Sequence, residues 1–181
     1  MLKQILAIAM SIVLLPGIRA EESNNTARVN WVTIEEAQEL VKKNPRKILV
    51  DIYTDWCGWC KRMDAVTFSH PVIVSYINEN FYAVKLNAEQ TEPIMFRGQE
   101  FVNENPGKPR SAHNFAYAVL QGRLGYPAVA FFDEELNLLT VLPGFREPKQ
   151  FEPILAFFDN NVYHTNPNLD EFIKNFESSI D

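Results

Sequence analysis

Short, continuous apolar runs alternate along the chain with stretches in which apolar residues recur every three or four positions. The continuous runs are rich in β-branched and aromatic residues, which predicts strands at residues 29–32, 47–54, 81–86, 128–132 and 138–141. The recurring pattern predicts amphipathic helices at residues 34–44, 57–66, 111–120, 148–160 and 168–176, and one that begins near Pro71.

Local signals mark several of the element ends. Thr33 and Glu36 match a capping box, in which each side chain accepts a hydrogen bond from a free backbone N–H at the helix start. The residues that this helix should bury are Ile34, Ala37, Leu40 and Val41. Further along, a hairpin is expected within residues 94–102, Ser111 is the expected cap of the next helix, and residues 133–136 should form a turn.

The order of these elements predicts an α/β fold. Strand–helix alternation in the first half is typical of parallel strands joined by helical crossovers, whereas the two closely spaced strands near the end indicate an antiparallel pair. A mixed central sheet flanked by helices on both faces satisfies both patterns. The length of 181 residues suits one domain with a sizeable core.

The first twenty residues form a separate segment. Lys3 precedes an apolar run at residues 5–15, and Ala20 is a small residue at the expected cleavage point. This run is shorter than the roughly 20 residues that span a bilayer, so it indicates a cleavable signal peptide, with an uncleaved anchor helix as the alternative. The chain then divides into a signal peptide at 1–20, a flexible leader at 21–28 and a globular domain at 29–181.

Charge excludes one class of partner. The net charge is −6, and loss of Lys3 and Arg19 with the signal peptide leaves 15 basic and 23 acidic residues, a net charge of −8. Phosphates repel so acidic a protein, and no basic cluster with interleaved aromatic residues occurs, so nucleic acid is not an expected partner. Stable membrane insertion after cleavage is not expected either.

The chain has two cysteines, Cys57 and Cys60, at the start of a predicted helix that follows a buried strand. A small exported protein that used disulfides for stability would spread more of them along its length. A thiolate attacks a disulfide, and the free N–H groups of a helix N-terminus favour that anion. The placement predicts a redox pair in which Cys57 is the nucleophile and Cys60, one turn further in, is the more buried resolving thiol. No other cofactor is expected.

The spacing of the pair alone leaves two alternatives open. CxxC is also half of a zinc site, but His70, His113 and His164 lack a paired ligand spacing, so no metal is expected. These histidines are expected to lie at the surface or to cap helices, His113 within a helix. The other alternative is a purely structural disulfide, although so short a loop would stabilise the fold weakly.

The residues that flank the cysteines resemble a known family. Residues 50–61 (VDIYTDWCGWCK) are similar to the active-site stretch of thioredoxins, and residues 125–133 (GYPAVAFFD) to the stretch that carries their cis-proline. Residues 144–145 are a third match, and together the matches span roughly residues 30–160. The resemblance is to the exported branch of the family, which includes the periplasmic C-terminal domain of the bacterial transmembrane disulfide reductase and tends to carry a stretch like residues 67–69.

This resemblance implies a catalytic role for Asp51 as well as for the cysteines. Asp51 matches the buried acidic residue of the family. Burial disfavours a charged carboxyl and raises its pKa, so Asp51 could take and return the proton of Cys60 during exchange. An aspartate that only bonds nearby backbone is the alternative.

The resemblance also implies a substrate surface. Trp56 should shield the disulfide and, together with Gly58 and Trp59, offer a surface to the substrate. The bond between Tyr126 and Pro127 should be cis and face the cysteines. The Tyr126 backbone could then pair with an extended substrate chain by strand addition.

The chain departs from thioredoxins in three places. Gly58-Trp59 stands where thioredoxins have Gly-Pro, an insertion covers about residues 90–117, before the cis-proline, and a helical extension follows Asn160. The two additions either build a partner-specific rim or are packed decoration, and the sequence favours neither.

The resemblance implies a periplasmic or otherwise exported thiol–disulfide oxidoreductase. It would reduce disulfides in exported client proteins and be recharged by an upstream thiol electron donor, which a membrane protein could supply. The alternatives are a disulfide oxidase or isomerase, and a non-catalytic binding module that uses the fold and a static disulfide to hold a partner.

Overall fold

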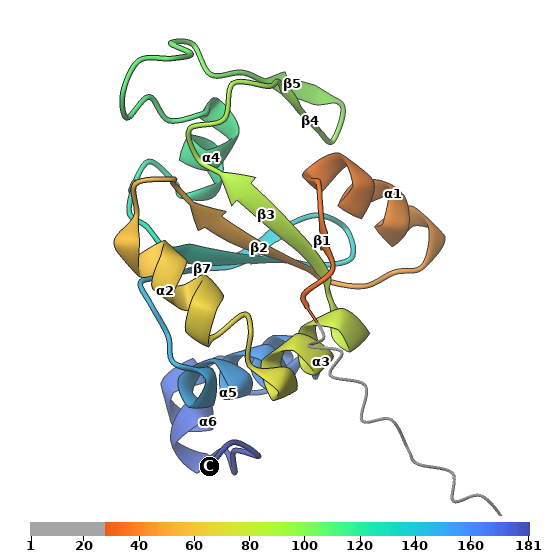
Figure 1. The fold of residues 1–181 in the computed structure, drawn as a ribbon. Helices are drawn as coiled ribbons and strands as arrows, with labels where there is room; N and C mark the ends of the chain where they lie inside the picture. Colours follow the sequence, from red (N-terminus) through yellow and green to blue (C-terminus); the bar gives the residue numbers. More distant parts are fainter. Residues whose placement is uncertain (1–27) are drawn as a thin grey trace, which may run out of the picture.

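Figure 1 shows the fold in a computed structural model, which describes residues 28–181. The predicted signal peptide and residues 21–27 of the leader lie outside the described residues. The strands are β1 (Trp31–Val32), β2 (Ile48–Tyr53), β3 (Tyr82–Asn87), β4 (Ile94–Phe96), β5 (Gln99–Phe101), β6 (Ala128–Phe132) and β7 (Leu138–Pro143). The helices are α1 (Ile34–Lys43), α2 (Gly58–Val66), α3 (Pro71–Asn80), α4 (Asn114–Val119), α5 (Pro148–Asp159), the 3₁₀ helix η1 (Val162–His164) and α6 (Leu169–Asn175). No helix within residues 28–181 is long and apolar enough to cross a membrane.

The central sheet is mixed and has five strands in the order β1-β3-β2-β6-β7. β2 runs parallel to β3 and antiparallel to β6, and β6 runs antiparallel to β7. Parallel neighbours need a long crossover, which α2 and α3 provide between β2 and β3, whereas a short turn suffices between β6 and β7. The mixed α/β fold predicted from the order of the elements is confirmed.

Helices cover both faces of this sheet (Figure 1). One core cluster joins α1, α4 and the β4–β5 hairpin to one face, and a second joins α2, α3 and α5 to the other. On β2, Val50 and Ile52 belong to the first cluster and Leu49 to the second. Successive side chains of a strand point to opposite faces, so Asp51 lies with Leu49 on the face that α2 covers. Burial on both faces explains why the β2 sequence is an almost unbroken apolar run.

Helix α1 begins as predicted but buries a different residue. The Thr33 N–H donates to Glu36 Oε2 at 2.9 Å and the Glu36 N–H donates to Thr33 Oγ1 at 3.1 Å, which completes the capping box. Leu40 is only half-buried, whereas Gln38 is buried. The Gln38 side chain donates to the Met95 carbonyl at 2.9 Å and accepts from the Arg97 N–H at 2.8 Å. A polar residue occupies this position because the backbone of the β4–β5 hairpin needs hydrogen-bond partners there.

Part of the insertion at residues 90–117 packs into the core, whereas most of its side chains are exposed or half-buried. The Phe115 ring on α4 lies 5.1 Å from the ring of Phe96 on β4 and 5.4 Å from that of Phe101 on β5. The predicted cap of α4 is wrong, because His113 and not Ser111 precedes the helix: its Nδ1 accepts from the Phe115 N–H at 3.1 Å. His113 is therefore a cap, as expected, but it is fully buried and precedes the helix instead of lying within it.

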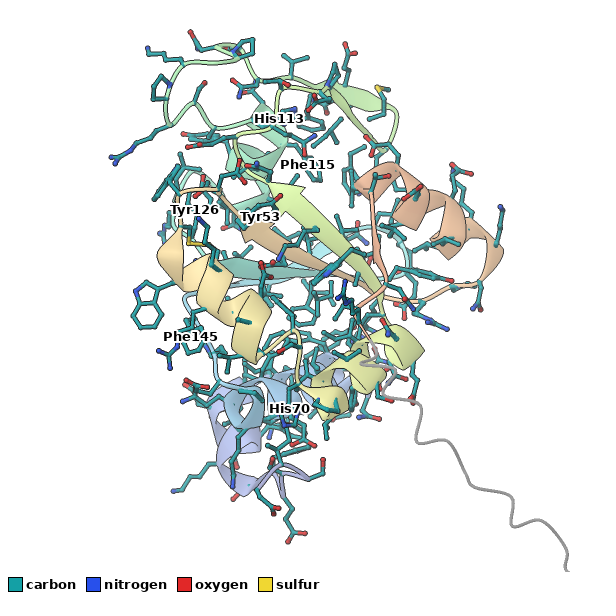
Figure 2. All side chains as sticks on the ribbon, viewed as in Figure 1. Tyr53, His70, His113, Phe115, Tyr126 and Phe145 are labelled. Carbon is teal, nitrogen blue, oxygen red and sulfur yellow. A yellow bond between two sulfur atoms is a disulfide. The ribbon has the colours of Figure 1, made fainter. Side chains whose placement is uncertain are left out.

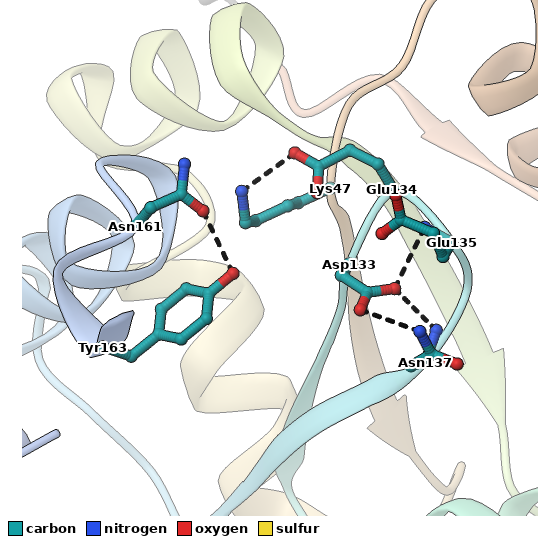
Figure 3. Close-up of polar contacts among 7 residues, drawn as sticks. All are labelled: Lys47, Asp133, Glu134, Glu135, Asn137, Asn161 and Tyr163. Atoms are coloured by element: carbon teal, nitrogen blue, oxygen red, sulfur yellow. Dashed lines mark hydrogen bonds and ion pairs between the residues drawn. The ribbon is translucent and has the colours of Figure 1, made fainter. Parts of the chain in front are cut away.

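The turn between β6 and β7 is held by one side chain (Figure 3). Asp133 Oδ1 accepts from the backbone N–H groups of Glu135 and Asn137, at 3.0 and 2.7 Å. Beside this turn, the buried Lys47 ammonium forms an ion pair of 2.9 Å with Glu134. The predicted turn at residues 133–136 is confirmed, and its ion pair ties it to the start of β2.

The C-terminal extension packs on α5. Phe172 of α6 lies 5.4 Å from Phe157 of α5, measured between ring centroids. Glu152 is buried within α5, where its carboxylate accepts from the hydroxyls of Ser178 and Ser179, at 2.5 and 2.6 Å. Burial alone would raise the pKa of Glu152, but these hydrogen bonds outweigh burial and the net shift is downward. The extension is thus anchored by both aromatic packing and a buried carboxylate.

Candidate active site

The two cysteines meet at the N-terminus of α2 and form a disulfide. Cys57 is the N-cap of α2, and the Cys60 N–H donates to Cys57 Sγ at 3.1 Å. The turn from β2 into the helix is held by a bond of 3.1 Å from the Cys57 N–H to the Thr54 carbonyl. Cys57 therefore lies where unpaired N–H groups and the helix dipole lower the pKa of a thiol and favour its thiolate. This is the placement that the sequence predicted.

The buried cysteines are flanked in sequence by two exposed tryptophans. Cys57 is 5% exposed and Cys60 is 3% exposed, whereas Trp56 and Trp59 are 54% and 57% exposed. Cys60 is the more buried of the pair, as expected, but the difference is small. The argument for Cys57 as nucleophile therefore depends on its position at the helix end and not on exposure. Gly58 is exposed, and a Cβ there would meet nothing within 4 Å, so the surface beside the disulfide is open.

The proline loop lies beside the same end of α2. The Tyr126–Pro127 bond is cis, and Figure 2 shows Tyr126 next to the disulfide. The Tyr126 ring packs edge-on against Trp56, with the ring centroids 6.0 Å apart. An open groove is lined by Trp59, Tyr126, Pro127, Gly144 and Phe145. Of the residues predicted for the substrate surface, Trp59, Tyr126 and Pro127 thus line this groove together with Gly144 and Phe145, and Trp56 packs against Tyr126.

Phe145, which lines one side of the groove, is held in place by contacts to α2. Thr67, fully buried at the end of α2, donates its hydroxyl to the Arg146 carbonyl at 2.5 Å. Phe145 then lies 5.4 Å from Trp59, between ring centroids, and the guanidinium of Arg62 lies over both rings at 5.3 and 5.6 Å. Sequence analysis did not assign a role to Arg62. Its only signal in the sequence was a positive charge two residues after Cys60, in the motif CGWCKR.

Asp51 lies on the face of the sheet that α2 covers, with 2% of its surface exposed. Its Oδ2 accepts from Lys85 Nζ at 2.5 Å, and Lys85 also contacts the Asp64 carboxylate of α2. Burial raises the pKa of Asp51 to about 6, against the opposing effect of Lys85. Its Oδ1 has no hydrogen-bond partner within the described residues. Asp51 is therefore a carboxyl whose proton is gained and lost near neutral pH.

Lys85 is the residue of this site that sequence analysis missed. It interrupts the apolar run FYAVKL of β3 and pairs directly with Asp51 in the sheet register. Burial lowers the pKa of Lys85, but the carboxylates of Asp51 and Asp64 outweigh burial and the net shift is upward. The ammonium also lies 5.0 Å from the centroids of the Trp31 and Tyr53 rings. A charged residue in an apolar strand, opposite another such residue, is the signal that could have found it.

The histidines lie away from the cysteines or have structural roles. His70 precedes α3 and His113 precedes α4, while His164 is exposed in η1. Burial lowers the pKa of His113, which favours the neutral ring that its capping bond requires. Within residues 28–181, no group of three or more His, Cys, Asp and Glu side chains is arranged to hold a metal ion.

Comparison with known proteins agrees with this geometry. A family profile for a thioredoxin-like domain matches residues 34–159. The chain is 25% identical over 139 residues to the thiol:disulfide interchange protein DsbD of Pectobacterium atrosepticum, and 29% identical over 135 residues to the protein of that name from Actinobacillus pleuropneumoniae. These matches cover 74% and 73% of this chain but 21% and 20% of those proteins, so the chain spans about a fifth of the length of these relatives.

Solved structures show the same fold. A thioredoxin from Thermus thermophilus superimposes with a TM-score of 0.54 at 16% sequence identity, covering 72% of this chain and 87% of that protein. The family profile ends at residue 159, before the C-terminal extension that packs on α5.

Proposed function

Because the chain belongs to the thioredoxin-like domain family, we propose that it is a thiol–disulfide oxidoreductase that reduces disulfides in exported client proteins. The observation that carries this proposal is the Cys57–Cys60 disulfide, which lies at the N-terminus of α2 with the Tyr126–Pro127 loop beside it. A disulfide used only for stability would not need an open groove and two exposed indoles beside it.

The reaction begins from the reduced pair. The Cys57 thiolate attacks one sulfur of the client disulfide, a mixed disulfide forms, and the other client sulfur leaves as a thiolate. The Cys60 thiolate then attacks Cys57 Sγ, which releases the second client thiol and closes the Cys57–Cys60 disulfide. Two electrons pass to the client, and a dithiol donor of higher reducing power returns the pair to its reduced state.

Asp51 accepts the proton of Cys60 in the resolving step. Cys60 must lose this proton before its sulfur can attack Cys57 Sγ. The pKa of Asp51 is raised to about 6, which suits a general base at neutral pH. Lys85 stabilises the charged form of Asp51 and links it to the partly exposed Asp64.

The client chain binds across the groove by strand addition. The carbonyl and N–H groups of Tyr126 are offered to an extended peptide, which gives affinity without sequence preference. Trp56 and Trp59 flank the disulfide and cover the apolar parts of the client. The predicted signal peptide at residues 1–20 supports a site of action outside the cytoplasm, in the periplasm or a comparable exported location.

The proposal is tested by reduction of insulin in the presence of dithiothreitol. The protein should accelerate the reaction, and Cys57→Ser should return it to the uncatalysed rate. Cys60→Ala should instead trap a covalent adduct with Cys57, which mass spectrometry of captured clients can identify. Turnover that persists in Cys57→Ser would contradict the mechanism.

The redox potential distinguishes a reductase from an oxidase or isomerase. Strong oxidants of this fold lie near about −120 mV, isomerases near about −180 mV and thioredoxin near about −270 mV. The buried Asp51 favours a reductase, since a base for Cys60 speeds the release of the client. Equilibration with glutathione should give a value below about −180 mV, and a higher value would favour the oxidase or isomerase.

A further inference from the structure

We propose that Arg110 selects clients that carry an acidic side chain within a few residues of the attacked cysteine. This inference rests on the proposed disulfide reductase function and adds the chemistry of the client. Arg110 belongs to the loop at residues 103–112, called here the rim loop, which joins β5 to α4 within the insertion. Its guanidinium lies over the Trp56 ring, 5.3 Å from the centroid.

The base of the rim loop is closed by one buried side chain. Asn103 is 6% exposed, and its amide donates to the carbonyls of Gln90 and Ser111 at 3.2 and 2.9 Å. Its Oδ1 accepts from the Ser111 hydroxyl at 2.8 Å and from the Asn105 N–H at 3.1 Å. These bonds hold Ser111, the neighbour of Arg110. The backbone of Arg110 is therefore held beside Trp56 by the rim loop.

Arg110 is charged, exposed and without an ionic partner among the described residues. None of the ion pairs formed within residues 28–181 involves Arg110. The acidic side chains near Trp56 bond to neutral donors, since Glu89 Oε1 accepts from Trp56 Nε1 at 3.0 Å and Asp55 Oδ2 accepts from the Asn87 amide at 3.2 Å. Neither carboxylate is among the ion pairs of the described residues. The planar guanidinium is thus free to bind a carboxylate from outside, with the paired N–H geometry that arginine favours.

The contacts of Trp56 link Arg110 to the reacting pair. Trp56 directly precedes Cys57 in the chain, and its ring lies 5.3 Å from the Arg110 guanidinium and 6.0 Å from the Tyr126 ring. The client chain pairs with the Tyr126 backbone while its cysteine reacts with Cys57. An extended chain advances about 3.3 Å per residue, so a client carboxylate bound by Arg110 lies within a few residues of that cysteine. The protein is acidic overall, and salt screens charges over about 10 Å, so Arg110 attracts only carboxylates that are already close to it.

The test uses three peptides that differ at one position. Each has a single cysteine in a disulfide with thionitrobenzoate, and the residue two positions away is Asp, Asn or Lys. The reduced protein attacks the peptide sulfur, which joins the peptide to Cys57 and releases coloured thionitrobenzoate. An exposed ion pair is worth up to about fivefold, so the Asp peptide should react about threefold faster than the Asn peptide at low salt, and the Lys peptide more slowly. High salt should reduce these differences.

Variants assign the preference to Arg110. Arg110→Gln should make the Asp and Asn peptides react at equal rates, and Arg110→Glu should make the Lys peptide the fastest. Lys108→Ala is the matched control, because it removes the same charge from the same loop at a position without a contact to Trp56 among the described residues; it should keep the threefold ratio. Equal rates in the unmodified protein, or an unchanged ratio in Arg110→Gln, would overturn the proposal. Failure of every peptide to react would instead overturn the reductase function.

Discussion

Replacement of Asp51 by Asn should make the protein more stable at neutral pH but not at acid pH. The substitution keeps the size of the side chain and removes its charge. Asp51 is buried, its Oδ1 has no hydrogen-bond partner among the described residues, and Lys85 is its one cationic partner there. Lys85 keeps the Asp64 carboxylate in the variant, so its ammonium is not left alone.

The magnitude follows from the pKa of Asp51. Burial raises it from 3.8 to about 6, and each unit corresponds to about 1.4 kcal/mol. As the pH rises, the unfolded chain loses this proton first, so the folded protein holds more protons between about pH 4 and pH 6. The free energy of unfolding therefore falls across that window, by up to ~3 kcal/mol once Asp51 is charged. Below about pH 4 the carboxyl is neutral in both states and the stabilisation is fully present.

The assay is urea unfolding of the oxidised protein, followed by tryptophan fluorescence from about pH 4 to about pH 8. The difference between Asp51→Asn and the unmodified protein cancels every other titration. It should rise in favour of the variant by up to ~3 kcal/mol between pH 4 and 7. Asp64→Asn is the control, because it removes the half-exposed carboxylate on the same lysine, and its difference should stay within about 1 kcal/mol. A flat difference for Asp51→Asn, or one that falls with pH, would refute the reasoning.

Three further substitutions test how the additions and the turn are held. Phe115→Ala should lower the free energy of unfolding by about 3–5 kcal/mol, because this ring of α4 is buried against β4 and β5. Tyr117→Ala, on the exposed side of α4, is the control and should have little effect. Equal losses would argue against a core role for the insertion. Glu152→Gln should weaken docking of residues 178–180 by about 2 kcal/mol, which should appear as faster amide hydrogen exchange in those residues. Unchanged exchange rates would show that the Glu152 carboxylate does not hold them. Glu134→Gln leaves the buried Lys47 without its carboxylate and should cost about 3 kcal/mol in urea unfolding. An unchanged free energy of unfolding would show that this ion pair does not hold the turn.

Much of the fold was predictable because its signals are local. The β2 run is apolar except at Asp51 because both faces of that strand are covered, and the capping box of α1 needs only Thr33 and Glu36. The burial of Gln38 in place of Leu40 was not predictable, since it depends on the hairpin backbone that lies against α1. The cap of α4 was missed because Ser111 is the commoner capping residue, but its hydroxyl is used by Asn103.

The sequence by itself placed the cysteine pair at the start of a helix that follows a buried strand, and its resemblance to thioredoxins implied the proline loop and the acidic residue within β2. Each is encoded by residues that are adjacent or a few positions apart, where backbone geometry leaves few choices. Only the tertiary structure decided that Lys85 meets Asp51 and that Arg110 lies over Trp56, since 34 and 54 residues of chain separate these partners. Which distant segments meet depends on how whole helices and strands pack, and one-dimensional periodicity carries no information on that.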